Sequence, residues 1–342
     1  MPSEIPIQNL YFLLCYAWDR LPEAKEVDIA ANDCHSLTEL LAKLLANGTQ
    51  RLIKRGLDRD YLPHREDTAV PRGRMDLTAS FPLLAARKQR LVCEFDEFTH
   101  NTLPNRILKT TLASLHHVDG LGENTNILLL QQNELLRRIP PIRLTSRLFQ
   151  RVRLHRNNRD YRFLLNICQL LHDTRLPEQK DGKTRFRDFT REPRLMPALF
   201  EAFVKNFYKR EQSKYQVSAI QLEWDAHCTE GDRAILPIMR TDVSLWSPDH
   251  SIILDCKFYK EAMVGRYDPK AHSSHLYQIY SYLRNAESRQ GWEKSEGILL
   301  YPANGDSFDH LFRIANHNIR VLTVDLGKPW KDIHAELLKL TV

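Results

Sequence analysis

The sequence predicts an α/β protein in two parts: an N-terminal α+β region over residues 1–185, and a C-terminal domain over residues 186–342 with a mixed sheet flanked by helices. Length is the first reason, because 342 residues can bury two separate cores. A polar, glycine-containing stretch at 177–186 is the second, because the pattern of helices and strands changes after it. With 42% hydrophobic and 27% charged residues, the composition excludes disorder, collagen and coiled coil.

Charge and cysteine usage narrow the class of protein only slightly. The formal net charge of +6 permits an anionic partner without requiring one, since a solvated surface explains it equally well. Six cysteines are scattered without a C-x-x-C pair, so we expect neither a zinc site nor a disulfide framework. The N-terminus lacks a secretory pattern, and no apolar run approaches the ~20 residues that cross a bilayer. We therefore expect a cytoplasmic protein with no membrane partner.

The N-terminal region combines helical and extended patterns. Apolar residues recur at helical spacing in three segments, 8–18, 36–55 and 103–117. Ser36 followed by Glu39 fits a capping box at the start of the second segment. Between the second and third segments, prolines and glycine separate short extended pieces, and residues 74–80 and 90–95 predict strands.

An arginine-rich stretch at residues 137–162 follows these elements. It contains nine arginines and few acids: Arg137, Arg138, Arg143, Arg147, Arg151, Arg153, Arg156, Arg159 and Arg162. Guanidinium groups bind phosphates and release counterions. A solvated helical face or pairing within the chain explains such a run equally well. The sequence leaves both readings open, and also whether the stretch would contact DNA or a protein.

After the boundary, the predicted order is one helix, three strands, one helix, two strands and a final helix. We expect these elements at residues 195–209, 216–224, 236–246, 251–259, 272–285, 297–301, 320–325 and 330–340. Three strands in succession, followed by a helix that crosses back to the sheet, predict an α/β domain.

The second and third of these strands place two acids opposite each other. Alternation puts Asp242 on one face of its strand, and Asp255 and Lys257 on a shared face of the next. A turn centred between Pro248 and Asp249 brings Asp242 directly across from Asp255.

This acid pair predicts a metal site. Two carboxylates at cross-strand distance, roughly 4.5–5.5 Å, destabilise a sheet unless a cation lies between them. Mg²⁺ prefers carboxylate and water oxygens, and Lys257 can lie beside a scissile phosphate. The pattern thus predicts phosphodiester hydrolysis, in which the metal lowers the pKa of water and both cations stabilise developing negative charge. The structural alternative is a surface hairpin with an Asp255–Lys257 salt bridge.

Polar residues on the two flanking helices extend the pattern. Glu201 borders the apolar stripe of the helix at 195–209 and can reach the end of the sheet, although a solvated glutamate is an equal alternative. Gln278 and Tyr282 are four residues apart on the helix at 272–285, so they share a face. A half-buried helix with aromatic core contacts would explain the tyrosine as well.

In chain order, a helix acid, an aspartate, Asp-x-Lys and Gln-x-x-x-Tyr resemble the PD-(D/E)xK nuclease superfamily, in the branch that carries Gln-x-x-x-Tyr. Other segments look like the McrC family, the nuclease subunits of McrBC 5-methylcytosine-specific restriction systems. These segments are IPIQNLY at 5–11, YAW at 16–18, TLPNRILK at 102–109, LLYP at 299–302 and LGKPW at 326–330. The resemblance therefore covers nearly the whole chain.

The resemblance implies roles for the residues of the hairpin. Asp242 and Asp255 would coordinate Mg²⁺ together with the carbonyl of Cys256. Lys257 would position or activate the attacking water. Asp255 stands where glutamate is commoner in the superfamily, and its shorter side chain leaves the coordination geometry open.

The resemblance also implies roles for the flanking helices. Glu201 would be the helix acid of the superfamily, and Gln278 and Tyr282 would support the site and contact the backbone phosphate. Thr241 replaces the proline that precedes the first acid in the superfamily name, a change that removes no ligand.

Members of the McrC family work with McrB, an AAA+ GTPase hexamer that recognises methylated double-stranded DNA. The resemblance implies that the N-terminal region docks on that ring and stimulates GTP hydrolysis, with the turn at Arg72 to Arg74 as a candidate tip and an ordinary β-turn as its alternative. The chain has no G-x-x-x-x-G-K-[ST] loop, so we expect GTP to bind the partner. Two other functions stay open: a stand-alone structure-specific repair nuclease, and a non-catalytic activator of an NTPase ring.

Overall fold

The computed structural model divides the chain into two units. It describes residues 5–19, 34, 36–116, 118–155, 158–175, 186, 194–258, 263–264, 270–303 and 307–341. One unit comprises Met1–Asn32 and Asp188–Val342, and the other comprises Asp33–Arg187. This division differs from the one expected at 185/186, because the first helix belongs with the C-terminal unit. In the part of the chain that the structure describes, no helix is long and apolar enough to span a membrane.

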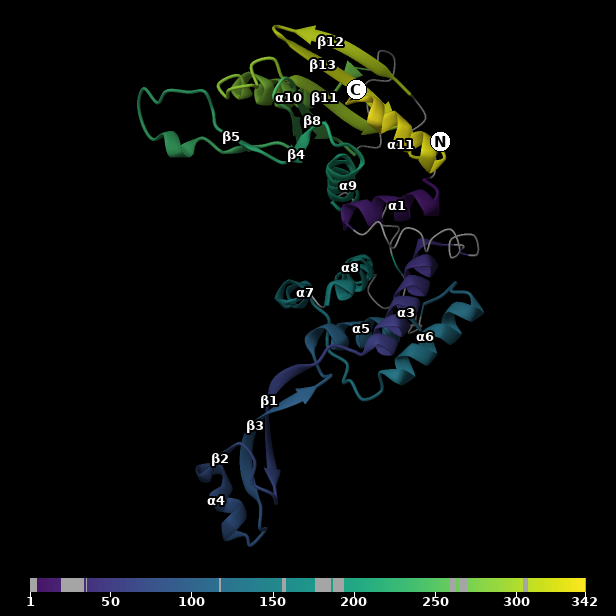
Figure 1. Ribbon diagram of the computed structural model, residues 1–342, viewed down its shortest axis with the longest axis vertical. Coiled ribbons are helices and arrows are strands. Elements are labelled where there is room, and N and C mark those ends of the chain that lie inside the picture. Colours follow the sequence, from purple (N-terminus) through teal and green to yellow (C-terminus); the bar gives the residue numbers. More distant parts are fainter. Residues whose placement is uncertain are drawn as a thin grey trace. The chain divides into compact units, whose positions relative to one another are not determined.

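The C-terminal unit is built on a six-stranded mixed sheet (Figure 1) of order β12-β13-β11-β8-β7-β4. Its strands are β4 (Gln216–Ser218), β7 (Val243–Trp246), β8 (Ser251–Cys256), β11 (Glu296–Pro302), β12 (Asp309–Ile314) and β13 (His317–Val324). The strands β8, β11 and β13 are parallel, and the remaining neighbours pair antiparallel. Helix α10 (Ser273–Ala286) is the crossover between β8 and β11. The predicted α/β class is confirmed.

Two strands that the sequence predicted as continuous are interrupted. The stretch 216–224 forms β4 and β5 (Gln221–Leu222), and the stretch 236–246 forms β6 (Met239–Arg240) and β7. Strands β5 and β6 pair only with each other. The break occurs where Thr241 N–H donates to Ile220 O at 3.1 Å, and Ile220 N–H donates to Thr241 Oγ1 at 3.0 Å. A further short ribbon joins β9 (Met263–Val264) and β10 (Lys270–Ala271).

Helices cover both faces of the six-stranded sheet. On one face, Ile253, Leu299 and Ile319 form a buried core with Ile279 of α10. Because side chains alternate along a strand, Cys256 of β8 points to the other face, where it interacts with Tyr208 of α9 (Leu195–Glu211). Helix α11 (Trp330–Lys339) packs against β13.

Helix α1 (Ile7–Ala17) packs along α9 and α11. Asn206 Nδ2 of α9 donates to Tyr16 O at 2.9 Å and to Ala17 O at 3.1 Å, at the end of α1. The Phe12 ring stacks on Trp330 at 4.7 Å. Asn9 Nδ2 donates to the carbonyl of Leu326 at 2.7 Å. The N-terminal helix is therefore part of the C-terminal core.

The second unit contains a helical body and a smaller β element. The helices are α3 (Leu37–Arg55), α5 (Leu103–Leu115), α6 (Glu123–Leu135), α7 (Ser146–Arg151) and α8 (Arg159–Thr174). The predicted cap of α3 is present, since Ser36 Oγ accepts from Glu39 N–H at 3.1 Å. The buried Glu39 carboxylate also accepts from Gly122 N–H at the start of α6. This ties the first turns of α3 and α6 together.

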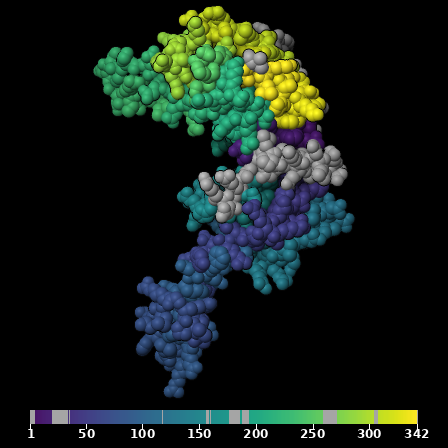
Figure 2. All heavy atoms as spheres, in the orientation of Figure 1, coloured from purple at the N-terminus to yellow at the C-terminus, as the bar shows by residue number. Residues whose placement is uncertain are grey.

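The β element of this unit, here called the β lobe, extends from the helical body (Figures 1 and 2). It consists of β1 (Asp60–Thr68), β2 (Arg74–Asp76), α4 (Leu77–Ala85) and β3 (Leu91–Thr99), with β3 central in the sheet. The predicted strand at 74–80 is wrong after Asp76. The chain turns into α4 there because Asp76 Oδ1 accepts from Ala79 N–H at 3.0 Å and caps the helix.

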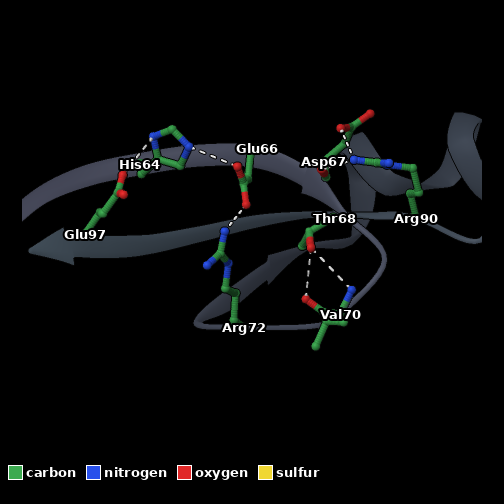
Figure 3. A network of polar contacts seen from close by, with 8 residues as sticks. All are labelled: His64, Glu66, Asp67, Thr68, Val70, Arg72, Arg90 and Glu97. Atoms are coloured by element: carbon green, nitrogen blue, oxygen red, sulfur yellow. Dashed lines mark hydrogen bonds and ion pairs between the residues drawn. The ribbon is translucent and has the colours of Figure 1, made fainter. Parts of the chain in front are cut away.

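Ion pairs fix the turn between β1 and β2 (Figure 3). Arg72 pairs with Glu66, which also pairs with His64, and the Arg72 guanidinium lies 3.9 Å from the centroid of the Phe95 ring. Gly73 has φ 65°, and a Cβ there would lie 2.3 Å from a backbone oxygen of β3. Only glycine fits this turn without distortion.

Candidate active site

The hairpin of β7 and β8 has the predicted register. Val243 pairs with Leu254 and Trp246 pairs with Ser251. Asp242 lies just before β7, in the bend that follows β6, and Asp255 lies within β8. The Cys256 N–H donates to Asp242 Oδ2 at 2.9 Å. The backbone of β8 thus holds the Asp242 carboxylate beside Asp255, although Asp242 is not itself in a strand.

The Asp255 carboxylate is fully buried and poorly satisfied. Its Oδ2 lies 2.7 Å from Lys257 Nζ, and the Asp255 side chain is 0% exposed. Oδ2 is therefore held by a charge-assisted contact with the Lys257 ammonium, whereas Oδ1 has no hydrogen-bond partner among the described residues. Burial raises the pKa of Asp255, the charge of Asp242 raises it further, and Lys257 opposes both effects. Binding a proton or a further cation at Asp255 would therefore be favourable.

Lys257 is held as a cation beside this carboxylate. Its side chain is 14% exposed. Burial, the largest influence, lowers the pKa of Lys257, but the charge and hydrogen bonding of Asp255, together with the charge of Asp242, raise it, and the net shift is upward. The Lys257 N–H donates to Leu300 O at 2.9 Å, which extends the pairing with β11 one residue beyond β8. The backbone of Lys257 is therefore fixed by β11, and its ammonium group is held by the charge of Asp255.

Glu201 of α9 belongs to the same charged group. Burial raises the pKa of Glu201, and the charge of Asp242 raises it further, whereas Lys205 and Arg240 lower it. The structure thus brings the predicted helix acid into electrostatic contact with the hairpin, with three cations nearby, Lys257 among them. The solvated glutamate considered as its alternative does not describe this half-buried side chain.

Gln278 and Tyr282 project from the same face of α10, as predicted, and bond to each other. Gln278 Nε2 donates to Tyr282 Oη at 2.8 Å, and Tyr282 Oη donates to the carbonyl of Arg240 at 2.9 Å. Tyr282 also interacts electrostatically with Asp255 and Asp242. The pair links α10 to β6, immediately before the first acid of the hairpin.

The sequence prediction missed a buried pair next to these residues. His275 of α10 shares a hydrogen bond of 2.8 Å with Tyr301 of β11. Burial, followed by the charge of Lys257, lowers the pKa of His275 to about 4, so this imidazole is neutral at pH 7. The signal was available, because residues 275, 278 and 282 recur at helical spacing on one face.

The donor set fits a hard divalent cation. Asp242 and Asp255 supply carboxylate oxygens, which suit Mg²⁺. Burial raises the pKa of the Cys256 thiol well above its usual value, so this residue can offer a hard ligand only through its carbonyl. No group of three or more His, Cys, Asp and Glu side chains in the described ranges is arranged to hold a metal alone. A metal here would need backbone, water or substrate oxygens to complete its coordination.

Comparison with known proteins identifies the family. The model of the McrBC 5-methylcytosine restriction system component matches residues 7–302. The type IV methyl-directed restriction enzyme EcoKMcrBC of Escherichia coli K12 is 32% identical over 341 residues, which cover 98% of this chain and 97% of that protein. A solved assembly of Thermococcus gammatolerans McrB AAA+ hexamers with bound McrC contains a chain with a similar fold. Its TM-score is 0.59 at 17% identity, covering 98% of this chain and 76% of that one. This chain therefore belongs to the family of McrBC 5-methylcytosine restriction system components, as its sequence resemblance indicated.

Proposed function

We propose that this protein is the Mg²⁺-dependent DNA endonuclease subunit of a McrBC-type restriction complex. One observation supports the proposal most strongly: the buried, poorly satisfied Asp255 lies between the charges of Asp242 and Lys257. A structural salt bridge would satisfy its carboxylate. This one retains repulsion between two acids, as expected of a site that awaits a cation.

The metal would be held by Asp242, Asp255 and the carbonyl of Cys256. When bound, it would lower the pKa of a coordinated water and offset negative charge on the phosphate. The Cys256 N–H keeps Asp242 in place for this role. Because Asp255 already resists ionisation, loading the site would release any proton that it holds.

Lys257 would stabilise the negative charge that develops on the phosphate. Its ammonium group is fixed close to Asp255 and stays charged, so it needs little reorganisation during the reaction. Glu201 would act on the water or the metal from the side of α9. Gln278 and Tyr282 would hold α10 against β6 and offer side-chain polar groups to the DNA backbone.

The partner would be a McrB-type AAA+ GTPase hexamer acting on methylated double-stranded DNA. The solved relative is described as McrC bound to McrB AAA+ hexamers. We place the docking surface on the Asp33–Arg187 unit, where the β lobe exposes a stripe of apolar side chains on α4: Leu77, Phe81 and Leu84. Exposed apolar side chains at such spacing are anchors for a protein groove. GTP would be bound and hydrolysed by the partner and not by this chain.

Substitution in the hairpin tests this function. Asp255→Ala and Lys257→Ala should abolish DNA cleavage by the reconstituted complex, while assembly and stimulation of the partner's GTPase persist. Asp249→Ala, in the exposed turn of the same hairpin, is the matched control and should cleave normally. Loss of assembly in the first two variants would mean that the hairpin has a structural role.

Two further outcomes separate the alternatives. Full DNA cleavage by a complex that contains the Asp242→Ala variant would favour the alternative in which this chain is a non-catalytic activator of an NTPase ring. Cleavage by the purified chain with Mg²⁺ and DNA, without any GTPase, would favour a stand-alone repair nuclease.

A further inference from the structure

The arginine-rich stretch of the second unit is a solvent-facing surface. Seven of its arginines have described side chains, and all seven are exposed: Arg137, Arg138, Arg143, Arg147, Arg151, Arg153 and Arg162. Within the described part of the chain, only Arg137 among them forms an ion pair with an acid, Glu134, at 3.0 Å. Pairing with acids of the described segments, one of the two readings left open by the sequence, therefore does not account for this charge.

Four of these residues, here called the arginine row, lie on and around α7. They are Arg143, Arg147, Arg151 and Arg153. Arg147 and Arg151 are four residues apart on α7 and share a helix face. The two residues that cap α7, Thr145 and Val152, have extended backbone. Arg143 and Arg153 are exposed, whereas the apolar residues on either side of each are half-buried.

The backbone beneath the row is anchored. Ile142 N–H donates to Thr110 Oγ1 of α5 at 2.9 Å, and Arg106 of α5 donates to the carbonyls of Pro140 and Pro141 at 3.4 Å. Phe149 of α7 lies against His172 of α8, with ring centroids 5.6 Å apart. The row is thus displayed on a supported segment, which reduces the entropy cost of binding a ligand.

The surroundings of the row favour a polyanion over a protein groove. No large hydrophobic side chain is exposed among the described residues from 136 to 175, which carry the row and α8, whereas α6 of the same unit exposes Ile127, Leu130 and Leu135. Protein interfaces depend on buried aromatic and aliphatic anchors, and the described segments that carry the row offer none. The β lobe of the same unit has the opposite character, with exposed Leu77 and Phe81. Charge without apolar anchors is typical of binding to phosphates.

We propose that the arginine row binds the phosphate backbone of double-stranded DNA without regard to sequence. The inference rests on the proposed action on DNA and adds a contact that is separate from the acidic hairpin. DNA would then be held by the Asp33–Arg187 unit while the C-terminal unit carries the chemistry. Guanidinium groups suit this role because they chelate phosphate oxygens and stay charged.

Salt-dependent DNA binding tests the proposal. The full chain, in EDTA, is titrated with a short labelled duplex that lacks methylcytosine, and binding is followed by fluorescence anisotropy over ~0.05–0.3 M salt. The variant carries Arg143→Gln, Arg147→Gln, Arg151→Gln and Arg153→Gln. Each phosphate contact contributes about 0.9 to the slope of log K against log salt, so loss of all four should reduce the slope by up to ~3.6. Affinity at ~0.15 M salt should fall on the order of 10- to 1,000-fold.

Two control variants distinguish loss of this binding surface from a general loss of positive charge and from misfolding. Changing the same four arginines to lysine keeps the charge and should retain most of the binding. Removing four other exposed cations of the same unit lowers the net charge equally: Arg51, Lys54, Arg87 and Lys88. That variant should bind DNA as the parent does, and an equal loss of affinity would overturn the proposal.

The remaining outcomes are also decisive. Unchanged DNA affinity and slope in the glutamine variant would refute a DNA contact. Intact DNA binding with lost GTPase stimulation would assign the row to an acidic protein surface instead. The proposed nuclease function fails by a different result, namely absence of cleavage by the unmodified complex, which leaves the binding measurement interpretable.

Discussion

Replacing Asp255 by asparagine should stabilise the metal-free protein while it abolishes cleavage. Asparagine has nearly the same shape, keeps one oxygen that can accept from Lys257, and removes the charge that faces Asp242. Its amide can also donate a hydrogen bond to Asp242. The variant thus exchanges a buried, repelled carboxylate for a neutral group that can be satisfied.

The size of this effect follows from the burial of the carboxylate. A buried polar group without a hydrogen bond costs about 1–3 kcal/mol, and the Asp255 side chain is 0% exposed with Oδ1 lacking a hydrogen-bond partner among the described residues. For a unit of roughly 190 residues, each 1 kcal/mol shifts Tm by about 2–4 °C. Thermal unfolding in EDTA should therefore show the variant melting about 2–12 °C higher at neutral pH.

The difference in Tm between Asp255→Asn and the parent protein should increase with pH. The folded-state pKa of Asp255 lies above its ordinary value of 3.8. Stability associated with this group is therefore greatest below that value and is lost as pH rises through the higher folded-state pKa. The Tm difference between the two proteins should widen from pH 5 to pH 8.

A control variant and a refuting result complete this test. Asp309 of β12 has its pKa lowered by hydrogen bonds from Arg320, so Asp309→Asn should not stabilise the protein. If Asp255→Asn melted below the parent at every pH, the Asp255–Lys257 pair would be a net stabilising salt bridge. The reasoning for a site that awaits a cation would then be wrong.

Three further substitutions probe other parts of the structure. Thr241→Pro restores the proline of the superfamily name but removes the N–H that bonds to Ile220, and should destabilise the C-terminal unit by about 1–3 kcal/mol in denaturant unfolding. Gly73→Ala forces a Cβ to 2.3 Å from a backbone oxygen at a positive φ, and should increase proteolysis of the β lobe and reduce stimulation of the partner's GTPase. Tyr282→Phe removes the hydroxyl that bonds to the carbonyl before Thr241, and should lower the cleavage rate with a Tm loss of only a few degrees.

Each of these predictions has a contradicting outcome. Wild-type stability of Thr241→Pro would mean that the bend before β7 can be formed without its hydrogen bonds, and Thr241→Ser should keep them. An unchanged protease pattern for Gly73→Ala would show that β3 can move away from the turn. Full cleavage by Tyr282→Phe would remove the tyrosine hydroxyl from the proposed machinery.

Local pattern predicted the hairpin correctly because its determinants are local. Alternating apolar residues and a polar turn at 247–250 set the register, and four-residue spacing set the shared face of Gln278 and Tyr282. The position of Asp242 was predicted less well. The predicted strand is interrupted at Asp242 by a bend, which the hydrogen bonds between Thr241 and Ile220 create. These two residues are 21 positions apart, so the periodicity of the sequence does not reveal their contact.

Other errors have equally specific causes. All six residues of β12 are exposed, so this edge strand lacks the apolar alternation by which strands are predicted. The residues at 77–80 are compatible with a strand or a helix. Asp76 decides between them, because its side chain caps α4 and so ends the strand. The pairing of Asn9 with Leu326 joins positions 317 residues apart. Both lie in segments that carry the family resemblance, and the structure shows that they hold the two ends of the unit together.

The packing of α1 in the C-terminal unit also determines the order in which the newly made protein can fold. The hydrogen bond from Asn206 to Tyr16 spans 190 residues. At about 5–20 residues per second, α9 leaves the ribosome roughly 10–40 s after α1. During that interval the Asp33–Arg187 unit can form its core, while Leu10, Leu13 and Leu14 of α1 still lack the helix that covers them. Helix α1 is therefore made well before the helix that completes its packing, and its apolar face would need protection during that interval.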